Sequence, residues 1–151
     1  MQVLKDCFEA GVTCASHHPR REHLVACGSY DETVALFDVR YLSQKPICHS
    51  SKLDGGIWRI KWHPVSDDRL LVAAMHGGCR VLRLTGWDGD VVSGDTANAG
   101  IEVTKKFTQH ESMAYGADWL VCKHPTQSGY FEAAASCSFY DRSVYLWDTV
   151  F

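Results

Sequence analysis

The 151-residue chain lacks both an excess of positive charge and a long run of apolar residues. Its formal net charge is -3 at pH 7, so it has no basic patch of the kind that general nucleic-acid binding needs. Its apolar runs are short, as in residues 70–75, whereas a membrane-spanning helix needs about 20 apolar residues. Lys5, Asp6 and Glu9 stand where a secretory signal would be apolar. We therefore expect a cytoplasmic protein that binds neither nucleic acid nor membranes.

Paired cysteines are also absent. The seven cysteines are an odd number, and no two form a Cys-X-X-Cys pair. Several lie inside apolar segments such as LVACG and AASCS, which favours free, buried thiols in a reducing compartment. A zinc site built from scattered cysteines and histidines is the weaker alternative, because the usual ligand spacing is missing. We expect no metal and no cofactor.

No convincing helical period extends over eleven residues, and the chain instead repeats a pattern of short strands. Residues 29–38, SYDETVALFD, match residues 139–148, FYDRSVYLWD, at a constant offset, and MHGGCRVL at 75–82 is a weaker third copy. Each copy follows an apolar run, and each run follows a His-Pro pair, at His18, His63 and His124.

Alternating segments rich in β-branched and aromatic residues, separated by glycine and proline, predict strands. We place these strands at residues 12–17, 23–28, 33–38, 46–50, 57–63, 70–75, 79–84, 101–107, 113–121, 131–137 and 143–148. Four strands per repeat, with the third ending in Phe-Asp or Trp-Asp, indicate a WD-repeat β-propeller blade. The predicted fold is all-β, with about three four-stranded blades at residues 12–50, 57–107 and 113–151.

Two departures from the repeat shape the predicted architecture. The second copy has Leu82-Arg83 where the third has Trp147-Asp148. Residues 85–100, rich in Gly, Asp, Ser and Thr, predict an exposed loop inserted into the second blade. Propellers typically have about four to eight blades, so three do not close a ring. We expect the C-terminal part of a larger propeller, with missing N-terminal blades as its partner.

Three strings go beyond the general repeat: HLVACGSYDETVALFDVR, then LDGGIWRIKWHP with LLVAAMHGG, then HESMAYGADW with SCSFYDRSVYLWD. In this order they resemble the diphthine methyl ester hydrolase family, also called diphthine methyltransferase, which are WD-repeat proteins of diphthamide biosynthesis. The resemblance covers nearly the whole chain except residues 85–100. It implies hydrolysis of the methyl ester of methylated diphthine, with elongation factor two as the protein substrate.

A buried network and a hydrolase triad compete for the same residues of the third repeat. His110, a strand serine (Ser136 or Ser138) and Asp141 have the side chains of a Ser-His-Asp triad. However, WD repeats commonly join a His, a strand-two Ser or Thr, a turn Asp and a strand-three Trp by buried hydrogen bonds, and His110, Ser136, Asp141 and Trp147 fill those places. We favour the structural network, since no Gly-X-Ser-X-Gly motif occurs.

His76 is a candidate general base. It occupies the turn position that Asp31 and Asp141 hold in the other repeats, and strand parity puts this turn at the same end as the loops at 53–56 and 110–112. Imidazole changes protonation near neutral pH, which suits a base that activates water. The alternative is a solvent-exposed turn histidine without a catalytic role.

Charged residues on the predicted inner strands form a second candidate group. Lys61 and Asp118 hold equivalent positions in neighbouring repeats, and Arg59 lies two residues before Lys61. Either Lys61 and Asp118 form a structural salt bridge, or Arg59 or Lys61 stabilises an oxyanion while Asp118 orients a base.

Aromatic residues at the same end are candidates for substrate binding. Aromatic faces attract cations such as the trimethylammonium group of diphthine, although packing in the core is the alternative. The candidates are Trp58, Tyr115, Tyr30 and Tyr140. The sequence leaves open a hydrolase, a non-catalytic WD scaffold that binds a protein partner, and an inactive fragment.

Overall fold

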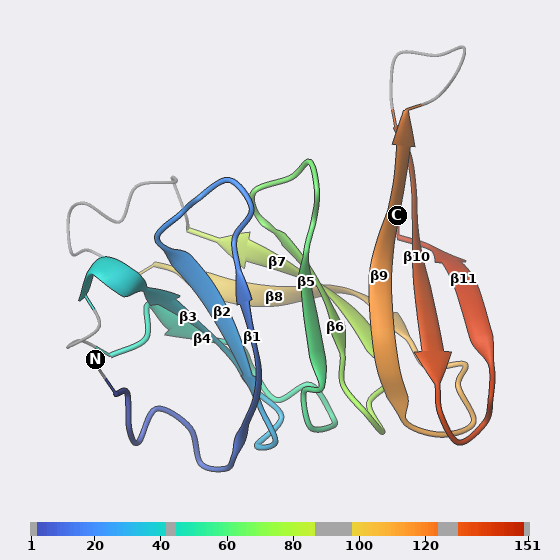
Figure 1. Ribbon diagram of the computed structural model, residues 1–151, viewed down its shortest axis with the longest axis horizontal. Coiled ribbons are helices and arrows are strands. Elements are labelled where there is room, and N and C mark those ends of the chain that lie inside the picture. Colours follow the sequence, from blue (N-terminus) through green and yellow to red (C-terminus); the bar gives the residue numbers. More distant parts are fainter. Residues whose placement is uncertain (1–2, 42–44, 87–97, 124–129, 150–151) are drawn as a thin grey trace.

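The computed structural model describes residues 3–41, 45–86, 98–123 and 130–149, which form three antiparallel sheets (Figure 1). The one helical element in these ranges is a 3-10 turn, η1 (Val39–Tyr41). No helix of the described chain is long and apolar enough to cross a membrane. The predicted all-β, WD-type fold is confirmed.

Each sheet is an up-and-down run of strands in chain order, as in a propeller blade. Blade 1 contains β1 (Val12–His17), β2 (Leu24–Ser29), β3 (Val34–Asp38) and β4 (Cys48–His49). Blade 2 contains β5 (Arg59–Trp62), β6 (Arg69–Ala73), β7 (Cys79–Thr85) and β8 (Gly100–Phe107). Blade 3 contains β9 (Ala114–Lys123), β10 (Tyr130–Ser138) and β11 (Val144–Asp148). The three blades lie side by side in chain order (Figure 1).

The predicted insertion in blade 2 falls between two paired strands. β7 ends at Thr85 and β8 begins at Gly100, where these two residues pair with each other. Residues 87–97, the centre of the predicted loop, lie outside the described residues.

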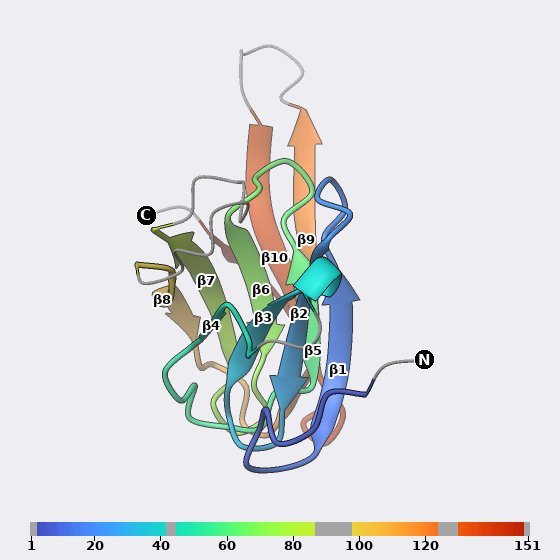
Figure 2. The ribbon, with the colours of Figure 1, turned by 90° about the vertical axis from the view of Figure 1, so that its left-hand side faces the viewer.

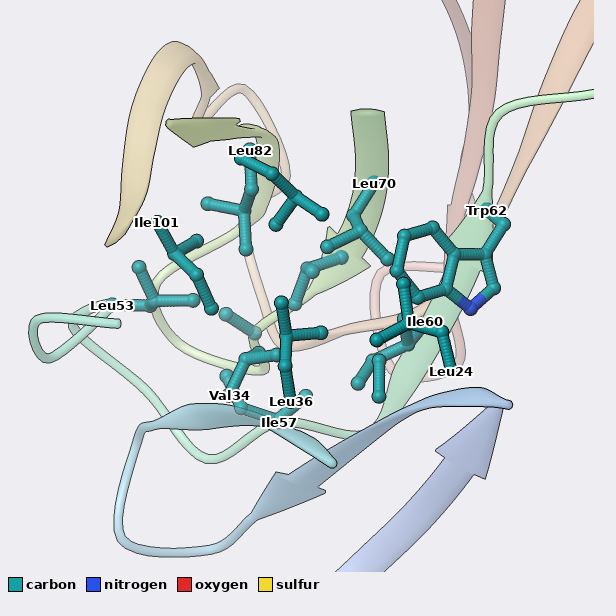
Figure 3. Packing of buried hydrophobic residues seen from close by; sticks show 14 residues of the cluster. Leu24, Val34, Leu36, Leu53, Ile57, Ile60, Trp62, Leu70, Leu82 and Ile101 are labelled. Atoms are coloured by element: carbon teal, nitrogen blue, oxygen red, sulfur yellow. The ribbon is translucent and has the colours of Figure 1, made fainter. Parts of the chain in front are cut away.

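Blades 1 and 2 pack through an aliphatic core that Figure 3 shows from close by. Its buried members are Leu24, Ala26, Val34 and Leu36 from blade 1, and Leu53, Ile57, Ile60, Trp62, Leu70, Val72, Ala74, Leu82, Leu84 and Ile101 from blade 2 and its flanking loops. Burying one such aliphatic side chain contributes about 1.5–3 kcal/mol, so this junction is a main source of stability.

The opposite face of blade 2 packs on blade 3. The buried members of this second core are Leu71, Ala73, Cys79 and Val81 from blade 2, and Ala114, Ala117, Trp119, Ala134 and Trp147 from blade 3. Successive residues of a strand point to opposite faces, so alternate residues of β6 and β7 pack against blade 1 and against blade 3. This explains why LLVAA is a continuous apolar run, because a strand covered on both faces has no polar face.

One type of hydrogen bond recurs at both junctions. The Trp62 indole Nε1–H donates to the main-chain carbonyl of Ser16, and the Trp119 indole donates to that of Lys61, each at 3.0 Å. Ser16 and Lys61 are equivalent, since Ser16 pairs with Ala26 and Lys61 with Leu71 at the same register. The tryptophan of each following blade therefore ties its first strand to that of the preceding blade.

His18-Pro19 and His63-Pro64 lie in the turns between the first and second strands of blades 1 and 2, at the end opposite the turns between the second and third strands. Nδ1 of His18 accepts two main-chain N–H groups that follow it, and Nδ1 of His63 does the same. Burial lowers the pKa of both imidazoles, which favours the neutral form that this acceptor role requires. The third pair, His124-Pro125, lies outside the described residues, and the register puts Leu120 at the position of His18 and His63.

The cysteines are free thiols, as predicted, but their burial was predicted wrongly for most of them. Cys79 alone is fully buried, while Cys122 and Cys137 are exposed. Both exposed thiols belong to blade 3. The strands of this blade have apolar sequences, which predicted burial, but the described residues leave one face of the sheet uncovered.

Candidate active site

The loops that enter each blade and the turns between second and third strands gather at one end of the molecule. This loop end lies at the bottom of Figures 1 and 2. Main-chain hydrogen bonds join the loops across the junctions: Ile57 N–H donates to the Ser29 carbonyl at 2.9 Å, and Ala114 N–H donates to the Met75 carbonyl at 3.0 Å. The loops are thus held on a rigid scaffold.

The four residues expected to lock blade 3 are brought together by the structure. His110 Nε2 lies 2.9 Å from Ser136 Oγ, which also accepts the Trp147 Nε1–H at 3.1 Å. His110 Nδ1 lies 3.2 Å from Asp141 Oδ2 and 3.0 Å from Ser143 Oγ. The order serine, imidazole, carboxylate is also that of a hydrolase triad.

Burial favours the structural interpretation of this network. The His110 side chain is 1% exposed, that of Asp141 6%, and Ser136 is 2% exposed. A nucleophilic serine has to reach a substrate carbonyl, whereas Ser136 Oγ is enclosed and already holds the indole of Trp147. The network therefore locks the turn and strands of blade 3 to the loop before β9.

The Asp141 carboxylate is strongly stabilised in its charged form. Burial alone raises the pKa of Asp141, but hydrogen bonds from the Ser143 hydroxyl and main-chain N–H, at 2.5 and 2.8 Å, and from His110 outweigh it. The pKa of Asp141 consequently lies far below its usual range.

Blade 1 locks its turn without histidine. Asp31 accepts the N–H of Thr33 at 3.0 Å and, in place of an imidazole, the N–H of Glu9 at 2.7 Å. Phe37 stands where blade 3 has its tryptophan, and Phe8 packs against it with ring centroids 6.3 Å apart. An apolar aromatic pair therefore replaces the polar His-Ser-Trp chain.

In blade 2 the same turn position belongs to His76. Its side chain is exposed and makes no hydrogen bond or ion pair with the described residues. His76 therefore forms no lock, and its imidazole faces solvent at the loop end. This position is compatible with both predicted roles, the general base and the plain turn histidine.

The loop before β5 and the His76 turn pack main chain against main chain. A Cβ atom at Gly55 would lie 2.1 Å from the Ala74 carbonyl oxygen, and one at Gly77 would lie 2.4 Å from that of Leu53. Real Cβ atoms do not approach so closely, so both positions require glycine. The glycines of LDGGIW and MHGG thus hold the His76 turn against the loop that leads to Trp58.

A buried arginine, which the sequence did not single out, fixes the same loop. The Arg80 side chain is 2% exposed, and its Nη2 donates to Asp54 Oδ2 at 3.0 Å. Lys106 Nζ lies 3.4 Å from the same oxygen, and both cations hold the pKa of Asp54 below its usual range. Asp54 adopts a left-handed φ of 67°, which directs the chain into Gly55. The sequence signal that could have identified Arg80 is a charged residue inside the otherwise apolar strand segment CRVLRL. Its partner Asp54 lies 26 residues earlier, so the pair itself had no local signal.

Lys61 and Asp118 form an ion pair across the junction of blades 2 and 3. Lys61 Nζ lies 2.9 Å from Asp118 Oδ2, and the two side chains are 41% and 61% exposed. This geometry matches the salt-bridge interpretation, while the exposure leaves both groups accessible to a ligand. An exposed pair contributes only about 0–1 kcal/mol to stability. Arg59, on the same strand as Lys61, is also exposed.

The four predicted aromatic residues form one half-exposed group at the loop end. The Trp58 and Tyr115 rings meet edge to face at 5.4 Å, and the Tyr115 and Tyr140 centroids are 6.0 Å apart. Tyr30 covers Gly56, where a Cβ atom would lie 3.1 Å from its ring. Partial burial and the neighbouring phenols of Tyr140 and Tyr30 raise the pKa of Tyr115. Trp58, Tyr30 and Tyr140 are 43%, 58% and 59% exposed, so they line the surface rather than the core.

No group of three or more His, Cys, Asp or Glu side chains in the described ranges is arranged to hold a metal ion. The arrangement that the structure does offer is an aromatic surface beside exposed cationic, anionic and imidazole side chains. Such a set can bind an organic cation and assist proton transfer.

Comparison with known proteins identifies the lineage of this scaffold. Residues 1–38 match the family model "WD domain, G-beta repeat". The diphthine methyltransferase homolog of Dictyostelium discoideum is 38% identical over 144 residues, which is 92% of this chain and 35% of that protein. The diphthine methyltransferase of Homo sapiens is 38% identical over 109 residues, 72% of this chain and 22% of the human protein.

A third relative, the diphthine methyltransferase of Schizosaccharomyces pombe, is 33% identical over 129 residues, 83% of this chain and 33% of that protein. The chain thus spans about a third or less of the length of these relatives. The chain belongs to the diphthine methyltransferase family of WD-repeat proteins.

Proposed function

We propose that this chain supplies the loop-end part of an active site that acts in diphthamide biosynthesis in the cytoplasm. The proposed reaction is hydrolysis of the methyl ester of methylated diphthine on elongation factor two. Family membership supports the pathway. The observation that supports an active site at the loop end is the half-exposed aromatic group beside the His76 turn.

The aromatic group suits the charge of the substrate. Diphthine carries a trimethylammonium group, which cannot donate a hydrogen bond and is attracted by the electron-rich faces of aromatic rings. Trp58, Tyr115 and Tyr140 meet at angles of 78° and 52° rather than in a flat stack, so their faces point in different directions. In this proposal they hold the cation, and Tyr30 completes the wall on the side of blade 1.

Each of the remaining candidate residues is assigned one role in ester hydrolysis. The His76 imidazole removes a proton from water, and the resulting hydroxide attacks the ester carbonyl carbon. Arg59 or Lys61 stabilises the negative charge that develops on the carbonyl oxygen, while Asp118 orients its partner Lys61. The C–O bond then breaks, and the methoxide takes back the proton from the His76 imidazolium and leaves as methanol. The carboxylic acid that remains on the protein loses its proton to solvent and becomes a carboxylate.

A direct test uses a chimera in which this chain replaces the matching region of the Dictyostelium relative. Its substrate is elongation factor two that carries methylated diphthine, and the readout is released methanol. We expect methanol release without any methyl donor. Trp58→Ala should raise KM about 2- to 30-fold, as expected for losing one cation–π contact of about 0.5–2 kcal/mol.

Three other results would contradict the proposal. Binding of elongation factor two without methanol release would indicate a scaffold. Net gain of methyl groups by the same protein would indicate methyl transfer, as the names of the relatives say. An unchanged KM for Trp58→Ala in an active chimera would place the cation elsewhere. Val65→Ala, an exposed apolar residue at the opposite end, is the matched control and should leave KM unchanged.

A further inference from the structure

A cavity of about 490 Å³ lies at the outer edge of blade 2, between the loop that follows β4 and the last strand of the blade, β8. Its volume falls within the usual range of ligand sites, about 300–1,000 Å³. None of its residues belongs to the aromatic group or takes part in the proposed ester hydrolysis. Its charged lining consists of Lys52, Asp54, Arg80, Glu102 and Lys106.

Arg80 puts a charge at a position where the blade fold does not require one. It pairs with Val72 of β6, and the equivalent pairs of the other blades have Ala35 and Tyr145 at this position. The Arg80 side chain is 2% exposed, whereas its ionic partner Asp54 is 61% exposed. Apolar residues usually stabilise a buried position as well as an ion pair does. The charge of Arg80 therefore indicates a role beyond the packing of the blades.

A β-bulge in β8 places a second cation beside Arg80. Thr104 is the extra residue, because its two neighbours pair with consecutive residues of β7. Lys106 consequently pairs directly with Arg80, whereas in a regular strand it would point away from the face of Ile101 and Val103. Bulges often occur next to functional sites, where they redirect a side chain. Here the bulge turns Lys106 toward the face whose apolar residues also line the cavity.

The cations of the cavity have donors to spare. Arg80 Nη2 donates to Asp54 at 3.0 Å, but the buried Nε–H of Arg80 has no partner in the described residues. Lys106 lies 3.4 Å from the same carboxylate, and the exposed Lys52 makes no hydrogen bond or ion pair with the described part of the chain. Like charges directly opposite each other, as Arg80 and Lys106 are, destabilise a sheet. Three cations and two carboxylates in the lining leave one positive charge without a counter-charge.

We propose that this cavity binds the carboxylate of an acidic side chain, carried by an extended segment of a protein partner. The carboxylate accepts hydrogen bonds from the cations of the cavity and supplies the missing negative charge. The methylene groups of the same side chain contact Leu53, Ile101 and Val103. β8 is the last strand of its sheet, so no described strand pairs with its outer edge, and the main chain of the segment can do so.

Two other anions fit this cavity less well. A phosphate group carries about 1.5 to 2 negative charges at pH 7, and Asp54 and Glu102 repel the charge beyond the first. A free small acid leaves the edge of β8 without a partner. An acidic side chain in an extended segment matches the charge, the apolar lining and the strand edge together.

The test titrates this chain with the blocked peptide acetyl-Val-Glu-Val-amide and follows the Arg80 Nε–H and the main-chain amides of residues 100–107 by nitrogen-15 NMR. We expect these signals to shift with a dissociation constant on the order of 1 mM, since one ion pair and a short strand contact supply little binding energy. Acetyl-Val-Gln-Val-amide, which has the same shape without the charge, should bind about tenfold more weakly or worse.

Lysine variants show whether the peptide binds in the cavity. Lys106→Gln should weaken binding of the glutamate peptide about threefold or more, because one cation is lost while the exposed position tolerates the change. Lys5→Gln, at an exposed lysine that does not line the cavity, is the matched control and should leave the binding unchanged.

Four results would overturn the proposal. Equal binding of the glutamate and glutamine peptides would show that the cavity does not recognise charge. Sodium butyrate that binds as tightly as the glutamate peptide would make a free acid the ligand, and tighter binding of inorganic phosphate would make it a phosphate site. No shift at about 20 mM glutamate peptide, where such a site would be nearly saturated, would show that there is no site.

Discussion

Ser136 and Ser138 stand two positions apart on β10, and both are buried, at 2% and 5% exposure. Ser136 Oγ lies between His110 Nε2 and Trp147 Nε1, whereas Ser138 Oγ has no hydrogen-bond partner in the described residues. At the residue scale, comparing these two serines distinguishes the effect of the hydrogen-bond network on stability from the effect of burying a hydroxyl.

Ser136→Ala should lower the free energy of unfolding by about 1–3 kcal/mol, because the Trp147 indole N–H and an imidazole nitrogen lose their partner while buried. Ser138→Ala removes a hydroxyl without partners and should change stability little or even increase it. Urea unfolding followed by tryptophan fluorescence measures both. Equal losses in the two variants would contradict the network.

Asp141 gives the network a dependence on pH. Its pKa is lower in the folded chain than the value of about 3.9 of an unfolded one, so the unfolded chain takes up the proton first as the pH falls. The stabilisation is fully present above about pH 5 and is lost progressively below about pH 4. Asp141→Asn should flatten the fall in stability below this pH relative to wild type. Parallel acid unfolding curves would show that Asp141 is not linked to folding.

The residues of this network were predictable because the WD repeat fixes their spacing. The pair of Arg80 and Asp54 was not, since no repeat places an arginine opposite an aspartate 26 residues earlier. The Lys61–Asp118 pair was found as one of two alternatives, because equivalence between blades put both on neighbouring inner strands.

At the scale of elements, the loop at 53–57 and the turn at 74–78 act as one unit. The two main chains touch at Gly55 and Gly77, and the Arg80–Asp54 pair holds the loop in place. This unit carries His76 on one side and leads into Trp58 on the other.

Gly55→Ala should destabilise this unit by about 1–3 kcal/mol, the usual cost of forcing extra atoms into a packed site, because the new Cβ would meet the Ala74 carbonyl. Gly11→Ala, at another loop-end position, is the control, since nothing lies within 4 Å of its Cβ. Thermal unfolding compares the two. A Gly55→Ala protein as stable as Gly11→Ala would mean that the close contact does not exist.

The strands were predicted well, because alternation, glycine and proline mark their ends directly in the sequence. The His-Pro rule failed as a guide to equivalent positions in blade 3. There β9 extends to Lys123, so Leu120 takes the place of the turn histidine and His124 follows four residues later. Nothing in the local sequence shows that β9 is longer than β1 and β5, because its apolar pattern continues without a break.

At the scale of the whole molecule, the blades are joined in series by one repeated junction, and the loop end is held by bonds across both junctions. The exposed thiols of blade 3 and its exposed apolar side chains, Leu120, Phe131, Val144 and Leu146, follow from this serial arrangement, because none of the described residues covers that face of the sheet. The sequence suggested buried cysteines because apolar strands of inner blades are covered on both faces, and composition does not tell which blade of a series has a free face.

The rate of ester hydrolysis tests most directly whether the loop end is the catalytic end. In the active chimera, His76→Ala should lower kcat about 100- to 10,000-fold, the usual contribution of a general base, with an unchanged unfolding curve. His23→Ala, another partly exposed histidine outside the loop end, should keep the wild-type kcat. Wild-type turnover by a folded His76→Ala chimera would contradict this account.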